Sequence, residues 1–126
     1  MRRNIPSPSP FAPVIAFSAA VSVGNLVFVS GTVGRDADGR FGPDAYAQTK
    51  QALANIAGVL EQAGASLRDV VRTRMFVTDA SNIDGAARAH REAFAEVMPA
   101  STIVEIKALA APEMLIEIEV DAVVGE

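Results

Sequence analysis

Residues 44–79, DAYAQTKQALANIAGVLEQAGASLRDVVRTRMFVTD, place a helical pattern, a turn and an alternating pattern in direct succession. Asp44 is a favourable helix N-cap, and Gly64 after the last apolar position is typical of a helix end. The apolar positions between them recur at helical spacing: Leu53, Ile56, Ala57, Leu60 and Ala63. From residue 69 the side chains alternate, which predicts a strand. This stretch therefore predicts a helix that packs on a sheet.

The flanking segments extend this arrangement in both directions. Upstream, VSVGNLVFVSG at residues 21–31 predicts two strands joined tightly at Gly24-Asn25. Downstream, Ser81 and Asp84 form a capping-box start for a second helix. That helix has its own apolar stripe, made of Ile83, Ala86, Ala87, His90, Ala93, Phe94 and Val97. Two further strands are predicted at about residues 101–107 and 115–124. The fold class is α+β, a two-layer structure with a mixed sheet and two helices on one face.

Period-two alternation separates the faces of the predicted strands. In the last strand the apolar residues Ile116, Ile118, Val120 and Ala122 share one face, and Glu117, Glu119 and Asp121 share the other. In the strand of residues 69–79, Arg72 and Arg74 lie opposite Val71, Thr73 and Met75. Charges of opposite sign can pair across neighbouring strands. Two helices cover one side of the sheet, so the charged side either contacts water or packs around an oligomer axis.

Length and composition define the class of protein. The 126 residues, half of them hydrophobic, predict a single domain over residues 1–126, with residues 1–16 as an N-terminal loop arm. The chain has no cysteine and one histidine, so we expect neither a metal nor another cofactor. No apolar run approaches the roughly 20 residues that span a bilayer, which favours a soluble cytoplasmic protein. A net charge of −4 argues against a broad nucleic-acid interface.

Three stretches of the chain together resemble a known family. They are FSAAVSVGNLVFVSGTVG from residue 17, the stretch of residues 44–79, and LIEIEVDAV near the C-terminus. In this order they resemble the RidA/YjgF family, also called the endoribonuclease L-PSP family. The resemblance implies a β-β-α-β-α-β-β, chorismate-mutase-like fold and homotrimers whose sheets face the threefold axis. It also implies a small-molecule ligand in clefts between subunits, where reactive imines and enamines are hydrolysed to ketones and ammonia.

The position of the family's substrate-binding arginine is changed in this chain. In deaminating members an arginine shortly after a Pro-Ala pair holds the substrate carboxylate, whereas here Pro99-Ala100 are followed by Ser101 and Thr102. The segment before this proline is also shorter than is usual in the family. Arg88 falls near a position that is often Asn, and it is the nearby residue that could replace the missing arginine. The resemblance therefore implies weak activity on 2-imino acids.

Other residues of the family's cleft can be matched to single positions of this chain. Ser30 and Gly31 match the strand end whose backbone holds the ligand, and Thr32 stands where the family usually has Gln. Phe17 occupies the position of an aromatic residue that closes the cleft. Glu117 matches the acidic residue that positions the hydrolytic water. Gly31 has an alternative explanation, since glycine also permits an unusual backbone angle.

The other candidates also have structural explanations. Glu117 could be a solvated or salt-bridged member of an alternating strand, and His90 a packed residue rather than a proton carrier. Ser101 lacks a Ser-His-Asp context in the sequence, so a hydroxyl that bonds the strand entrance is its alternative role. Arg88 could simply pair with Glu92 one helical turn away.

Three function classes remain open at the level of sequence. The first is a hydrolase for an imine, enamine or related metabolite, with Glu117 orienting water. The second is a metabolite-binding or regulatory trimer without turnover. The third is the ribonuclease or translation-inhibitor activity attached to the family name, against which the acidic charge balance argues.

Overall fold

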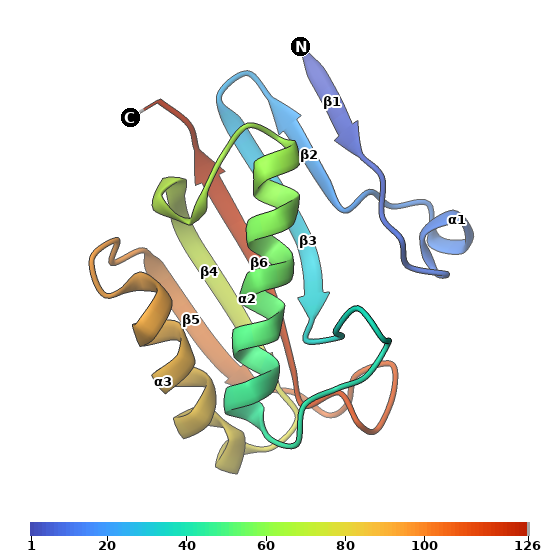
Figure 1. The fold of residues 1–126 in the computed structure, drawn as a ribbon, viewed down its shortest axis with the longest axis vertical. Coiled ribbons are helices and arrows are strands. Elements are labelled where there is room, and N and C mark those ends of the chain that lie inside the picture. Colours follow the sequence, from blue (N-terminus) through green and yellow to red (C-terminus); the bar gives the residue numbers. More distant parts are fainter. Residues whose placement is uncertain (126) are drawn as a thin grey trace.

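The computed structural model describes residues 1–125 as one mixed sheet with two long helices. The strands are β1 (Arg2–Ile5), β2 (Ala20–Val23), β3 (Leu26–Val33), β4 (Val70–Val77), β5 (Ala100–Glu105) and β6 (Ile116–Val123). The helices are α1 (Ala12–Ile15), α2 (Ala45–Gln62) and α3 (Ile83–Phe94), with 3-10 turns η1 (Leu67–Asp69) and η2 (Ala80–Asn82). Figure 1 shows α2 and α3 side by side across the sheet.

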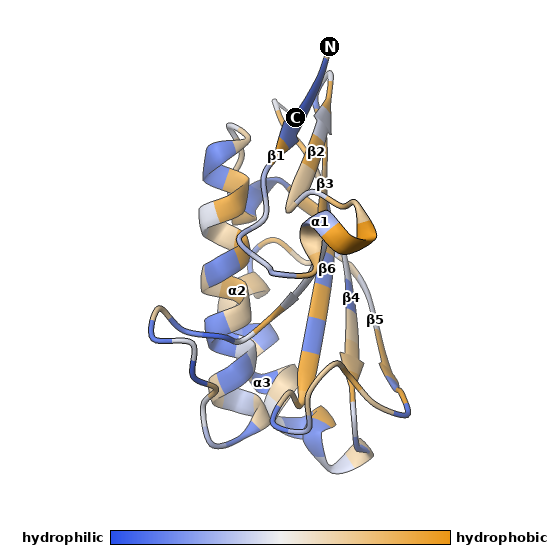
Figure 2. Ribbon diagram, turned by 90° about the vertical axis from the view of Figure 1, so that its right-hand side faces the viewer, coloured by the Kyte–Doolittle hydropathy of each residue, from blue (hydrophilic) through white to orange (hydrophobic). Residues whose placement is uncertain are grey.

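The sheet order is β1-β2-β3-β6-β4-β5, in which β4 and β5 are parallel and the other neighbours antiparallel. The long helices α2 and α3 lie on the same face, and the opposite face of β6 and β4 carries no helix (Figure 2). We call these the helix face and the open face. The predicted α+β, two-layer architecture is confirmed.

Helix α2 begins and ends at the predicted residues. The Asp44 side chain accepts a hydrogen bond from the Ala47 N–H at 2.8 Å, which satisfies one of the free donors of the first turn. Leu53, Ile56 and Leu60 are almost fully buried against the sheet. Gly64 follows the helix with φ +81°, a left-handed conformation that costs glycine little. The predicted hairpin is also present, with Gly24 at φ +59°.

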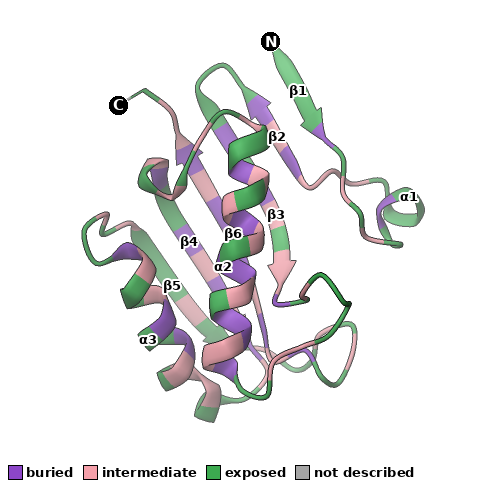
Figure 3. Ribbon diagram, viewed as in Figure 1, coloured by how far each residue is buried: buried purple, intermediate pink, exposed green. Residues whose placement is uncertain are grey.

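Strand β6 alternates as predicted. Its residues Ile116, Ile118, Val120 and Ala122 are buried, and the residues between them are partly exposed (Figures 2 and 3). On the open face, Arg74 lies 3.3 Å from Glu119 and 3.4 Å from Asp121. Arg72 lies 3.9 Å from Asp121. The predicted cross-strand pairing of opposite charges is confirmed.

Three local predictions were wrong. Val71 does not share the inward face with Thr73, because a bulge at Val70–Arg72 shifts the register and leaves Val71 47% exposed. Residues 1–16 are not a loop arm. They form the edge strand β1, which buries Ile5 beside β2, and the short helix α1. Instead of a Ser81 capping box, Asp79 accepts from the Ser81 N–H at 2.8 Å and starts η2 just before α3.

Among the described residues, no helix combines the length and the apolar composition needed to cross a membrane.

Candidate functional site

Glu117 and Gly31 lie against each other on the open face. Glu117 pairs with Val33 of β3 and Phe76 of β4, and the β3 register shifts between Val29 and Thr32. A Cβ atom on Gly31 would lie only 2.8 Å from Cδ and 2.9 Å from Oε2 of Glu117. The φ angle of Gly31 is not positive, so the glycine serves here for close approach and not for an unusual backbone angle. Its missing side chain leaves the room that the carboxylate occupies.

The electrostatic surroundings of Glu117 differ from those of its neighbours on β6. Glu119 and Asp121 have arginine partners, whereas within residues 1–125 the Glu117 carboxylate has neither an ion pair nor a hydrogen-bond donor. Partial burial raises the pKa of Glu117 above its ordinary value, and the nearby negative charge of Glu119 raises it further. An unpaired carboxylate with a raised pKa suits proton transfer to and from water.

Three further predicted residues lie near the same part of β3. The Ser30 Oγ donates to the Ser18 carbonyl at 2.6 Å, which joins β3 to the segment containing Phe17. Phe17 is partly buried just after α1, and its N–H bonds the Ala12 carbonyl. Thr32 bonds the Ser30 carbonyl at 2.8 Å and, as the register partner of Ile118, belongs to the helix face.

The corner at Pro99 separates its two hydroxyl residues. Ser101 pairs with Thr73, which belongs to the helix face, and Thr102 pairs with Arg74 on the open face. Two strands, β6 and β4, separate Gly31 from β5 in the sheet order, and adjacent strands are about 4.8 Å apart. A single chain therefore does not gather Glu117, Ser101 and Thr102 at one point. Most of β5 is exposed (Figure 3).

Ser101 belongs to a hydrogen-bonded chain that the sequence did not predict. The Thr73 hydroxyl donates to the Ser101 Oγ at 2.7 Å and lies 2.9 Å from the His90 Nε2. Thr73 is fully buried. A lone hydroxyl residue at an inward strand position between Val70 and Met75 was the available signal, but its partners depend on how α3 and β5 pack.

Arg88 is directed away from this corner. Its guanidinium lies 4.0 Å from the centre of the Tyr46 ring, a cation–π contact between α3 and α2. Glu92 does not pair with Arg88. It bonds the Tyr46 hydroxyl at 2.8 Å and lies 3.7 Å from the Lys50 Nζ. Because residues two apart on a helix differ by about 200°, Arg88 and His90 occupy nearly opposite sides of α3.

Two polar side chains of α2, the buried Gln48 and the partly buried Asn55, hold the segments that follow β3 and precede β6. The Gln48 side chain donates to the carbonyls of Gly42 and Glu113 and accepts from the Leu115 N–H. Asn55 donates to the carbonyls of Val33 and Arg35. These bonds fix the chain on both sides of Glu117, since Val33 is its β3 partner and residue 115 precedes β6.

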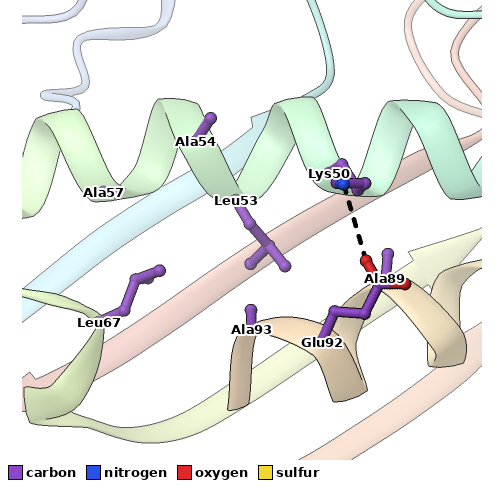
Figure 4. Close-up of a pocket in the computed structure, with 8 residues that line it drawn as sticks. All are labelled: Lys50, Leu53, Ala54, Ala57, Leu67, Ala89, Glu92 and Ala93. Atoms are coloured by element: carbon purple, nitrogen blue, oxygen red, sulfur yellow. Dashed lines mark ion pairs between the residues drawn. The ribbon is translucent and has the colours of Figure 1, made fainter.

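A groove of about 300 Å³ lies elsewhere, between α2 and α3 (Figure 4). Leu53, Leu67 and Ala93 line it, and the Lys50–Glu92 ion pair crosses one end. A second hollow of about 220 Å³ surrounds Tyr46 and Arg88. Neither hollow includes Glu117, Gly31 or Ser101. We therefore place the candidate site at the open face and not in these grooves.

Comparison with known proteins gives this geometry a context. The crystal structure of Rv2704 from Mycobacterium tuberculosis, a member of the YjgF/YER057c/UK114 family, is 44% identical, with a TM-score of 0.90 over 98% of this chain and 100% of that chain. A RutC family protein of Pyrococcus abyssi is 36% identical over 90% of this chain and 87% of the relative. The 3-aminoacrylate deaminase RutC of Acinetobacter baylyi is 35% identical over 89% of this chain and 87% of the relative.

The family model for endoribonuclease L-PSP matches residues 8–124, which contain every candidate site residue described above. The match also spans β2 to β6 and both long helices. The chain therefore belongs to the endoribonuclease L-PSP family, the RidA/YjgF family.

Proposed function

We propose that this protein hydrolyses a reactive imine or enamine to a carbonyl compound and ammonia. The observation that carries the proposal is the Glu117 carboxylate, which lies against Gly31 without a cationic partner among the described residues. The name of the Acinetobacter relative, a 3-aminoacrylate deaminase, supports an enamine as the class of substrate. The family match supports a shared site for this chemistry.

In the proposed reaction Glu117 acts as a general base for water. Its carboxylate accepts a proton from water as the water oxygen attacks the carbon of the protonated C=N bond, and this forms a neutral carbinolamine. The carboxyl group then gives that proton to the nitrogen. As the C–N bond breaks, the carboxylate takes the proton of the carbinolamine hydroxyl and passes it to the departing ammonia, so that the carbonyl compound and an ammonium ion are released. An enamine enters the same route after protonation at carbon converts it to the imine. The sum is imine plus water to carbonyl compound plus ammonia.

The proposed ligand carries no carboxylate at the Ser101 end. Ser101 offers a neutral hydroxyl, and the Arg88 guanidinium lies on the Tyr46 ring. On the open face, Arg74 is already bound by Glu119 and Asp121. A charge-assisted hydrogen bond contributes about 1.5–3 kcal/mol, so its absence should cost tenfold to a hundredfold on 2-imino acids. The expected ligand is uncharged or larger at this end.

We further propose that the cleft forms between copies of the chain in a homotrimer. Several apolar side chains remain exposed on the open face, among them Leu26, Phe28 and Val104 at 39%, 46% and 41%. Leu26 and Phe28 are neighbours on one face of β3, and exposed apolar side chains that lie together favour protein–protein contact. Because a single chain leaves Ser101 and Glu117 on different faces, a second copy is needed to complete the proposed site.

The test is ammonia release from an enamine generated in solution. Glu117→Gln should lower the turnover about 10²- to 10⁴-fold, the usual contribution of a general base. Glu119→Gln is the matched control, because Glu119 lies on the same face but is paired with Arg74. Equal turnover by the natural protein and Glu117→Gln would refute the proposal, and tight ligand binding without turnover would favour a regulatory trimer.

A second comparison addresses the missing arginine. We expect slow turnover of 2-iminopropionate by the natural protein, an increase in Ser101→Arg, and no change in Arg88→Ala. Fast turnover by the natural protein that survives Arg88→Ala would contradict the proposed ligand class. Fast turnover that Arg88→Ala abolishes would show that Arg88 leaves Tyr46 and binds the carboxylate.

A further inference from the structure

Three side chains from three elements form one hydrogen-bonded chain that ends at the exposed edge of the sheet. His90 of α3 lies 2.9 Å from Thr73 of β4, and Thr73 donates to Ser101 of β5 at 2.7 Å. The three side chains differ in exposure. Thr73 is fully buried, His90 is half-buried and Ser101 is exposed. The chain therefore runs from the half-buried His90 through the buried Thr73 to a surface hydroxyl.

The fold holds each member in place. The parallel register of β4 and β5 makes Thr73 and Ser101 direct neighbours. On α3, the His90 ring packs on the Phe94 ring one turn later, with centroids 4.7 Å apart. Phe94 is itself buried in the core. The imidazole thus has a packed face and a defined edge that meets Thr73.

The hydrogen bond from Thr73 to Ser101 gives the chain its direction. Thr73 has one hydroxyl hydrogen, which it donates to Ser101, so its other partner must be a donor. The His90 Nε2 must therefore carry a hydrogen. Burial lowers the pKa of His90, which favours the neutral ring with a single hydrogen. With that hydrogen on Nε2, Nδ1 carries none. The Ser101 oxygen accepts from Thr73 and keeps its own hydrogen for a group outside the strand.

We propose that His90, Thr73 and Ser101 act as a relay that presents Ser101 as an uncharged hydrogen-bond donor to the substrate. Successive donors polarise one another in the same direction, which strengthens the outermost hydrogen bond. The ligand group that this relay fits is a neutral carbonyl oxygen, as in an amide or an ester. Ser101 contacts the ligand, and Thr73 and His90 are positioning residues. The substrate part of this proposal rests on the proposed imine hydrolysis.

The direction of the relay can be measured without any substrate. His90 is the chain's single histidine, so two-bond ¹H–¹⁵N correlations of the ¹⁵N-labelled protein report its tautomer without ambiguity. At neutral pH we expect the hydrogen on Nε2 in the natural protein. A hydrogen on Nδ1 would reverse the chain and overturn the proposal. In Thr73→Val, which removes the acceptor at nearly constant volume, the two tautomers should become mixed.

Kinetics test the role of the relay in binding, with the imine of a 2-keto amide as the substrate. Ser101→Ala should raise KM about fivefold to tenfold, the value of one neutral hydrogen bond, with kcat nearly unchanged. Thr73→Val should raise KM in the same direction. His90→Gln, which keeps an N–H donor, should restore more of the natural KM than His90→Leu. Thr78→Val, the same change just beyond the end of β4, is the control and should leave KM unchanged.

The outcomes separate this inference from the proposed function. If Glu117-dependent turnover is present but Ser101→Ala and Thr73→Val leave KM unchanged, the relay does not bind substrate and the hydrolytic proposal survives. If turnover is absent, the hydrolytic proposal fails, and binding of the corresponding unreactive keto amide to the natural protein and to Ser101→Ala decides whether the relay holds a carbonyl. Equal dissociation constants would then overturn it.

Discussion

Glu117 differs from the other two acids of β6 in that no arginine balances its charge within the described residues. Its neighbours on the same strand stabilise the open face through cross-strand pairs, whereas the burial of Glu117 opposes its ionisation. Such a group costs the folded state free energy, and strained or unpaired groups of this kind are common at functional sites.

This cost predicts that replacing the Glu117 carboxylate by a neutral group stabilises the folded protein. The folded-state pKa of Glu117 is raised above the unfolded value near 4.5, so the unfolded chain ionises first as pH rises. The penalty is absent below that unfolded value, grows as pH rises towards the folded pKa, and is complete above it. Glu117→Gln should therefore raise the melting temperature at neutral pH but not at about pH 4. A variant that is less stable than the natural protein at neutral pH would assign Glu117 a structural role.

The contact between Gly31 and Glu117 predicts that substitutions at these two positions have non-additive effects on turnover. Gly31→Ala adds a Cβ within 2.8 Å of the Glu117 Cδ, and the flexible carboxylate end is what must move. We expect a large loss of turnover with little loss of stability. Turnover measured for both single variants and for the double variant with Glu117→Gln should show no further loss in the double variant. Additive losses would mean that Gly31 acts independently of Glu117.

At the scale of the elements, the sequence pattern predicted the structural features that depend on local sequence. The α2 caps and the Gly24 hairpin were predictable from residue type, and the faces of β6 from spacing. The bulge at Val71 was not, because a bulge depends on pairing between distant strands. The relay from His90 to Ser101 could not be predicted from the sequence, for the same reason. Its members are far apart in sequence, and only the β4–β5 register and the packing of α3 bring them together.

Glycine substitutions in the two long helices should have opposite effects on stability. Gly58 in α2 has no atom within 4 Å of the position of an added Cβ, so Gly58→Ala should stabilise the protein by about 0.5–1 kcal/mol. Gly85 in α3 would place its Cβ 3.0 Å from the backbone nitrogen of Tyr46, so Gly85→Ala should separate the helices and destabilise. Denaturant midpoints of both variants test this. A gain in stability in both variants would mean that the α2–α3 contact at Gly85 has room for a methyl group.

At the scale of the whole molecule, the open face is unusual for a surface that meets only water. It combines the arginine–carboxylate pairs of β4 and β6 with exposed apolar residues on β3 and β5. The sequence predicted the charges and left two explanations open, solvent or an oligomer axis. The proposed homotrimer accounts for both features, because the apolar residues would be covered and the ion pairs partly shielded from water.

A lysine at the open face tests this assembly. Phe28 is 46% exposed and pairs with Asp121, so Phe28→Lys should be tolerated in a single subunit but should place an extra charge in the interface. Light scattering should show a trimer for the natural protein and a smaller species for the variant. Ala54→Lys, at an exposed position on α2, is the control and should remain trimeric. A natural protein that is monomeric at micromolar concentration would remove the shared cleft.

The most direct test of the proposed function is a substrate preference measured on the natural protein. The central claim is that a site built around Glu117 hydrolyses imines without a group that holds a carboxylate. Ammonia release from a 2-imino acid and from its uncharged amide should therefore give a kcat/KM for the amide at least equal to that for the acid. Glu117→Gln should lower both values about 10²- to 10⁴-fold. A preference for the acid of about tenfold or more, as an arginine would confer, would contradict the claim. So would ammonia release from either substrate that does not depend on Glu117.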